Sequence, residues 1–82
     1  MNKSLDFHLE PPDDRLISLV VPVYNERVML PLFFDRVLPV LAAVNLRHEI
    51  VFVDDGSEDG SAGYIRNEIK RTPGLRLVKL SR

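Results

Sequence analysis

Three carboxylates lie in two short polar segments, each placed directly after an apolar run. Glu26 belongs to PVYNE, residues 22–26, and Asp54 with Asp55 belongs to VDDGS, residues 53–57. Acids gathered in one crevice create a negative field that disfavours a bare phosphate and favours hydrogen-bond donors or a cation. A carboxylate in such a crevice can accept N–H donors from a nucleobase or O–H donors from a ribose. The residue types therefore predict recognition of a nucleoside.

The glycine and serine that follow the two aspartates allow a second interpretation, a phosphate cradle at a helix N-terminus. The segment lacks the G-x-G-x-x-G and P-loop spacings, and the neighbouring acids would oppose a phosphate. We expect Gly56 to permit a positive φ at a tight turn. Ser57 or Asp59 is expected to cap the helix that follows. The nucleoside interpretation is preferred.

The overall composition excludes several classes of protein. The chain has 82 residues, 45% of them hydrophobic and 28% charged, which is typical of one small globular domain. A formal net charge of -1 gives no basic surface for nucleic acid. The absence of cysteine excludes a disulfide framework and a thiolate zinc site, and His8 and His48 are too few for a zinc cluster. No apolar stretch approaches the roughly 18 to 20 residues that span a bilayer, and the N-terminal segment has no apolar core for export.

Five segments alternate between strand and helix patterns after a polar lead-in, residues 1–15, that we expect to be flexible. Short runs of Val, Ile and Leu without alternation are typical of buried parallel strands, and apolar residues spaced by three and four are typical of helices. Pro39 falls inside the first helix pattern and predicts a kink or an interruption there. The patterns predict strands over residues 17–23, 49–53 and 75–80, and helices over residues 30–44 and 62–69.

The order strand, helix, strand, helix, strand with short connections predicts an α/β fold. Right-handed crossovers make the sheet parallel, and the simplest arrangement is the first half of a Rossmann-like fold with strand order 3-2-1 and helices on both faces. The first strand would then lie at the centre of a complete sheet, so the fold is incomplete as it stands. We expect the chain to be the N-terminal part of a longer protein, with an exposed strand edge that could pair two copies.

Ligands of open parallel sheets collect outside the carboxyl ends of the strands. The segments 22–26 and 54–57 both follow strand ends, so we expect them to face one pocket in which Tyr24 could stack on a base. Successive strand residues point to opposite faces. Asp54 and Asp55 therefore need not face each other, so that one can contact the ligand while the other supports the loop or caps the second helix.

The segments ISLVVPVYNE, EIVFVDDGSEDGS and LRLVKLSR together resemble the beginning of the family 2 inverting glycosyltransferases of the GT-A fold. Within that family the chain looks most like the polyprenyl-phosphate branch, which includes dolichol-phosphate mannose synthases and bactoprenol glucosyl transferases. The resemblance covers residues 16–82, and the pairing of PVYNE with VDDGS at this separation is its most specific feature. It implies that residues 16–82 form the N-terminal, nucleotide-binding portion of a glycosyltransferase domain.

The resemblance also implies roles for individual residues. Those that match positions lining the nucleotide pocket or contacting the base are Pro22, Tyr24, Glu26, Val53 and Asp55. The residues expected to support them are Asn25, Asp54, Gly56 and Ser57. A divalent metal, Mg²⁺ or Mn²⁺, is expected for the whole enzyme, but the Asp-x-Asp motif that holds it, the catalytic base and any membrane helices would lie outside residues 1–82. We expect no catalytic residue or metal ligand in this chain, and no turnover from it alone.

The implied partners are a UDP- or GDP-sugar and an acceptor, which in this branch is a polyprenyl phosphate. The protein would be cytoplasmic and would meet the membrane surface through parts outside this chain. Two alternatives stay open. One is a non-catalytic receiver-like signalling module, although receivers carry their acidic pair at the end of the first strand, where this chain has Pro22, Val23 and Tyr24. The other is an α/β piece that serves only in assembly.

Overall fold

The computed structural model describes residues 16–44 and 47–80. Its elements in chain order are β1 (Leu16–Val23), α1 (Leu30–Ala42), β2 (Arg47–Asp54), α2 (Ser61–Ile69) and β3 (Leu75–Lys79). All five elements expected from the sequence are present in the expected order. The expected flexible lead-in, residues 1–15, and the final residues, 81–82, lie outside the described residues.

The strands form one parallel sheet with the order β1-β2-β3, which is the expected 3-2-1 order read from the other edge. Val21 pairs with Phe52 and Phe52 with Leu77, so these three side chains share one face. Pro22, Val53 and Val78 form the neighbouring row and point to the other face. The α/β class and the partial Rossmann-like architecture are thereby confirmed.

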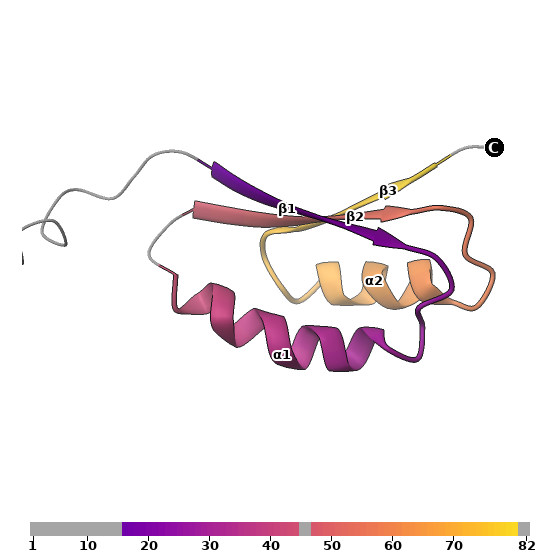
Figure 1. Ribbon diagram of the computed structural model, residues 1–82, viewed down its shortest axis with the longest axis horizontal. Coiled ribbons are helices and arrows are strands. Elements are labelled where there is room, and N and C mark those ends of the chain that lie inside the picture. Colours follow the sequence, from indigo (N-terminus) through magenta and orange to yellow (C-terminus); the bar gives the residue numbers. More distant parts are fainter. Residues whose placement is uncertain (1–15, 45–46, 81–82) are drawn as a thin grey trace, which may run out of the picture.

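The placement of the helices corrects one expectation, since both lie on the same face of the sheet rather than on both faces (Figure 1). Phe34 of α1 and Ile65 of α2 belong to one buried cluster with Phe52 of β2. The reason is geometric. Both right-handed crossovers step in the same direction across the sheet, and a helix reaches the opposite face only where that direction reverses.

The core lies between the helices and the face of the sheet that they cover. Its buried members are Val23, Leu30, Phe34, Ile50, Phe52, Ile65 and Leu75. The ring centroids of Phe34 and Phe52 are 5.4 Å apart, and that of Phe33 lies 5.8 Å from Phe52 with the rings nearly perpendicular. Such tilted and edge-to-face pairs add to the free energy gained from burial. The β1–β2 ladder and α1 are joined through this aromatic cluster.

Pro39 does not interrupt α1, so of the two expected outcomes, a kink or an interruption, the interruption is wrong: the helix is continuous from Leu30 to Ala42. Pro39 is exposed and lies in the last turn, and the exposed Asp35 carbonyl that loses its partner can bond to water instead. The helix also resumes normal bonding beyond it, because the Ala43 amide donates to the Pro39 carbonyl at 3.3 Å. Pro31 lies in the first turn, as expected.

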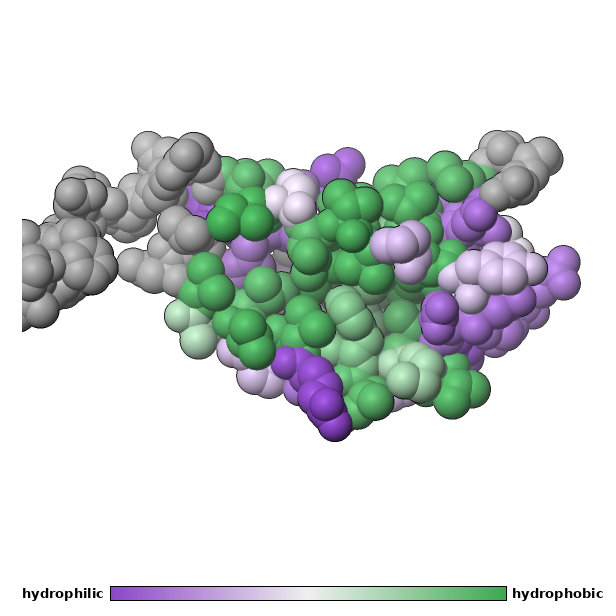
Figure 2. All heavy atoms as spheres, viewed as in Figure 1, coloured by the Kyte–Doolittle hydropathy of each residue, from purple (hydrophilic) through white to green (hydrophobic). Residues whose placement is uncertain are grey.

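Polar and apolar side chains separate along the molecule. Figure 2 shows hydrophilic residues gathered at the end where Figure 1 places the loops after β1 and β2, whereas hydrophobic residues cover the middle. The strand β1 carries exposed apolar residues, namely Leu16, Ile17, Leu19 and Val20. The polar end therefore coincides with the carboxyl ends of the strands.

Candidate functional site

The two polar segments lie next to each other at one end of the sheet, as expected. The last residues of the two strands, Val23 and Asp54, are register partners. The Asp55 amide then donates to the Val23 carbonyl at 2.9 Å, which extends the ladder by one bond beyond the strands. The PVYNE and VDDGS segments thus begin side by side.

Three consecutive backbone amides of the β1–α1 loop donate to three alternate side chains that follow β2. The Asn25 amide donates to Ser57 Oγ at 2.9 Å. The Glu26 amide donates to Ser61 Oγ, and the Arg27 amide to Asp59 Oδ2, both at 3.0 Å. We call these three side chains and the amides they bond the loop clamp. It joins segments that are more than thirty residues apart in sequence. It also gives hydrogen-bond acceptors to three amides that lie just before α1 and have no partner within that helix.

One further bond runs in the opposite direction across the clamp. The Glu58 amide donates to Asn25 Oδ1 at 2.9 Å. Asn25 has a φ of 52°, in the left-handed region that asparagine tolerates better than most residues. Its side-chain bond to the facing loop compensates for this conformation. Asn25, expected only as a supporting residue, thus makes two hydrogen bonds to the facing loop, one through its amide and one through its side chain.

Asp59 uses both carboxylate oxygens. Besides the Arg27 amide on Oδ2, its Oδ1 accepts the Ser61 amide at 3.0 Å and the Ser61 hydroxyl at 2.5 Å. These donors favour the charged form, so the Ser61 hydroxyl above all, and then the backbone amides, lower the pKa of Asp59 below its usual value. The Arg27 guanidinium carbon lies 4.2 Å from the centre of the Tyr64 ring on α2. Arg27 is therefore held through both its amide and its side chain.

The remaining expected nucleotide-binding residues are accessible at this end of the molecule. Tyr24 is 60% exposed, Pro22 and Glu26 are exposed, and Val53 and Asp55 are partly buried. Pro22 and Val53 are register partners on the face of the sheet that carries no helix. Gly56, expected to need a positive φ, has a φ of 85°. The next residue, Ser57, belongs to the loop clamp, where its hydroxyl oxygen accepts the Asn25 amide.

Asp54 differs sharply from the adjacent Asp55. It lies on the helix-covered face with Phe52 and is 0% exposed. Neither of its carboxylate oxygens has a hydrogen-bond partner among the described residues, so it does not cap α2, whose N-cap residue is Gly60. A buried carboxylate without a partner is costly. The expected separation of the two acids is observed, but the expected capping role of Asp54 is not.

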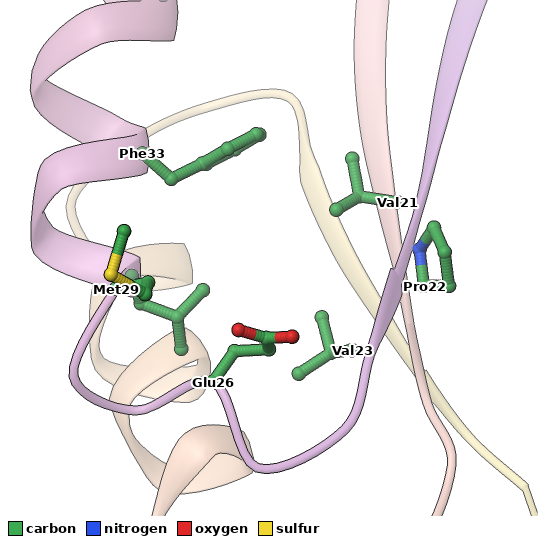
Figure 3. A pocket seen from close by; sticks show the side chains of 7 residues that line it. Val21, Pro22, Val23, Glu26, Met29 and Phe33 are labelled. Atoms are coloured by element: carbon green, nitrogen blue, oxygen red, sulfur yellow. The ribbon is translucent and has the colours of Figure 1, made fainter.

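A pocket of about 120 Å³ lies between β1 and the start of α1, beside the clamp. It is lined by Val21, Pro22, Val23, Glu26, Met29, Leu30 and Phe33. Figure 3 shows the Glu26 carboxylate directed into this mostly apolar space, facing Val23. Tyr24, Val53 and Asp55 do not line it. Of the expected contacts, Glu26 thus directs its side chain into the pocket and Pro22 borders it from β1, with its ring on the far side of the strand (Figure 3).

The acids at this end do not form a metal centre by themselves. Among residues 16–44 and 47–80, no group of three or more His, Asp or Glu side chains is placed to hold a metal ion. The acids at this end thus do not fit a bound divalent cation without further ligands.

The described part of the chain contains no helix with the length and apolar character needed to cross a membrane.

Asp59 and Ser61 are the residues whose importance sequence reasoning missed. Asp59 was considered only as a helix cap, and Ser61 was not considered at all. The available signal was the alternation S-x-D-x-S over residues 57–61, which places three short oxygen-bearing side chains at every second position after a strand end. Side chains of this kind bond readily to nearby backbone amides.

Comparison with known proteins gives a consistent picture. Residues 18–82 match the family described as Glycosyl transferase family 2. An undecaprenyl-phosphate 4-deoxy-4-formamido-L-arabinose transferase of Aeromonas hydrophila is 42% identical over 66 residues, which cover 80% of this chain and 20% of the relative. A protein with the same description from Pseudomonas savastanoi is 41% identical over 64 residues, 78% of this chain and 19% of the relative. A dolichyl-phosphate beta-glucosyltransferase of Dictyostelium discoideum is 33% identical over 84 residues, 94% of this chain and 26% of the relative. The chain therefore spans only about a fifth to a quarter of the length of these relatives.

Proposed function

The chain belongs to glycosyl transferase family 2, and from this premise we propose that it forms the nucleotide-sugar-binding part of an inverting glycosyltransferase. The observation that carries the proposal is the loop clamp, which holds the PVYNE loop against the loop that follows Asp55. Both loops lie at the carboxyl ends of parallel strands, where ligands of open α/β sheets bind. The family match leaves no observation in favour of the receiver-like alternative.

The residues around the clamp offer the contacts that a nucleoside needs. Asp55 can accept an N–H donor from uracil or guanine, and the exposed ring of Tyr24 can stack on a base. Pro22 and Val53, paired on the helix-free face, offer apolar surface beneath a base or ribose. Glu26 points into the neighbouring pocket and would accept a donor there. The donor is a UDP- or GDP-sugar in this proposal.

The acceptor that we propose is a polyprenyl phosphate. The relative with 42% identity is described as an undecaprenyl-phosphate 4-deoxy-4-formamido-L-arabinose transferase, and the relative with 33% identity as a dolichyl-phosphate beta-glucosyltransferase. Sugar transfer belongs to the whole protein in this proposal, since the chain spans 20% and 26% of these relatives. A divalent cation, Mg²⁺ or Mn²⁺, would be held by ligands outside this chain, and the whole enzyme would work at the cytoplasmic surface of a membrane.

Calorimetric titration with UDP and with GDP, each with and without Mn²⁺, tests the proposal. We expect one nucleotide to bind the chain or the longer protein that contains it, and Asp55→Ala to weaken that binding at least about tenfold, as loss of a charge-assisted hydrogen bond does. Glu58→Gln is the matched control, because it removes a charge three residues away from an exposed side chain. Absence of binding in all four titrations, or binding that Asp55→Ala leaves unchanged, contradicts the proposal.

A further inference from the structure

We propose that Asp59 is a positioning residue for nucleotide binding, which holds Tyr24 and Glu26 in register with Asp55 without touching the nucleotide itself. The inference rests on the proposed function and extends it to a residue outside the expected contact set. It follows from the way in which Asp59 connects three parts of the molecule: the loop after β1, the loop after β2 and the first turn of α2.

Asp59 has a different connectivity from the two serines of the clamp. Ser57 accepts one amide, that of Asn25, and Ser61 accepts one, that of Glu26. Asp59 holds the Arg27 amide on one oxygen and both polar groups of Ser61 on the other. Its bond to the Ser61 hydroxyl also directs that hydroxyl proton away from Glu26, so that the Ser61 oxygen presents a lone pair to the Glu26 amide. Removing the Asp59 carboxylate therefore weakens two of the three amide bonds.

Without Asp59, the segment would keep only the two bonds of Asn25 to the facing loop and the bonds that the Glu26 carbonyl accepts from the two amides at the start of α1. Tyr24, Asn25 and Glu26 are exposed, and Asn25 adopts the left-handed conformation. An exposed loop held mainly by a few hydrogen bonds opens at a low free-energy cost once those bonds are lost. Arg27 would keep its contact with the Tyr64 ring, which anchors the side chain but not the backbone of Glu26. Opening would thus move Tyr24 and Glu26 relative to Asp55, whose amide stays bonded to Val23.

The expected consequence is a loss of affinity with little loss of fold. When only a fraction of molecules has the binding arrangement, the apparent dissociation constant rises by the inverse of that fraction. A clamp closed in about a tenth of molecules would weaken nucleotide binding about tenfold. The core contains no clamp residue, and Ser61 is the only clamp residue that is buried, so the cooperative unfolding transition should change little.

The test compares Asp59→Ala and Asp59→Asn with Glu58→Gln. Glu58→Gln removes the same charge one position away and keeps the Glu58 amide bond to Asn25. Three quantities are measured for each protein: the dissociation constant of UDP or GDP, the midpoint of thermal unfolding, and the hydrogen-exchange rates of the Arg27 and Glu26 amides without nucleotide. Asparagine keeps one acceptor oxygen but turns an amide group toward a donor, so its effect should be intermediate.

We expect Asp59→Ala to weaken nucleotide binding about tenfold and to speed exchange of both amides, while Glu58→Gln matches the unaltered protein in all three measurements. Nucleotide binding by Asp59→Ala equal to that of the unaltered protein overturns the inference, as does unchanged exchange of the Arg27 amide. A fall in affinity that follows only from a lower unfolding midpoint, with Asp59→Asn unchanged, also overturns it. Failure of the unaltered protein and of Glu58→Gln to bind any nucleotide overturns the proposed function itself, which is a distinguishable result.

Discussion

The long side of β1 that does not pair with β2 contrasts with the carboxyl end of the strand. At the end, the amides of residues 25–27 are each bonded to a side chain of the facing loop. Along the free side, the backbone has no such partners among the described residues. Because the Val23 carbonyl points to β2, the groups of alternate residues, Pro22, Val20 and Ser18, point away from the sheet. Among residues 16–44 and 47–80, the amides at the clamped end have partners, whereas the outward-facing backbone groups of the free edge do not.

The two regions differ in where the hydrogen-bond partners of their backbone groups come from. The clamp joins the loop that follows β1 to the loop that follows β2 and to the first residue of α2, so its partners all lie within the described residues. The free edge needs a further strand to satisfy it. Pro22 fits there, because proline has no amide to leave unpaired on an exposed edge. The apolar residues beside it, such as the 60% exposed Val20, offer burial to whatever strand is added.

Phe52→Ala should have the largest effect, because it removes the side chain on which both regions depend. Phe52 is 0% exposed and contacts the rings of Phe33 and Phe34. Truncation of a buried phenylalanine typically costs about 3 to 5 kcal/mol, which is comparable to the whole stability of a small domain. Urea unfolding followed by circular dichroism measures the change. Val28→Ala, at an exposed position, should leave the transition within about 0.5 kcal/mol, and a similar result for Phe52→Ala would contradict the described core.

Asp54→Asn should have the next largest effect, with the opposite sign. Both oxygens of the buried Asp54 lack a partner in the described chain, and asparagine cannot carry a charge there. Because the asparagine amide is itself left without partners, we expect the free energy of unfolding to rise by only about 1 kcal/mol. Asp55→Asn, at the partly buried neighbour that we propose contacts the nucleotide, is the comparison and should not stabilise the fold. Destabilisation by Asp54→Asn would show that the carboxylate is paired in solution.

Much of this arrangement was predictable from sequence, for reasons that are visible in particular residues. Apolar runs identified the first two strands and a partly alternating run, LRLVKL, the third, and the spacing of Leu30, Phe34 and Ile65 identified the faces that α1 and α2 bury. Alternation separated Asp54 from Asp55. The side of the sheet on which the helices pack follows from the direction of the crossovers, and the role of Asp59 depends on which loop it faces. Both are tertiary facts that no local pattern carries.

The free edge predicts association of two copies through β1. With Leu19 on a two-fold axis, antiparallel pairing lets Ser18 and Val20 of one copy bond to Val20 and Ser18 of the other, and places the Pro22 carbonyl opposite the Leu16 amide. The opposite edge, β3, carries the exposed charges Arg76 and Lys79, which discourage pairing. We propose a concentration-dependent dimer, detected by sedimentation, that Val20→Lys dissociates. Val78→Lys, on the same face of the sheet but on β3, should leave it intact, and a monomer at all concentrations would contradict the pairing.

The smallest expected effect is that of lowering the pH. It compares Asp59 in the clamp with Glu49, which bonds to side chains of the two neighbouring strands. Hydrogen bonds from Ser61 lower the pKa of Asp59, and the Ser18 hydroxyl, helped by Arg76, lowers the pKa of Glu49 on the helix-free face. A carboxyl whose pKa is lower in the folded state stabilises the fold above its unfolded value, about 3.9 for Asp and 4.3 for Glu. That contribution is lost as the pH falls from those values through the folded pKa. As the pH falls below about 4, we therefore expect the Arg27 and Ser61 amide resonances to shift with Asp59, as followed by nuclear magnetic resonance, and Asp59→Asn to remove the shift. If the two resonances still move in Asp59→Asn, another acid controls the clamp, and the contrast between the closed end and the open edge would not depend on this carboxylate.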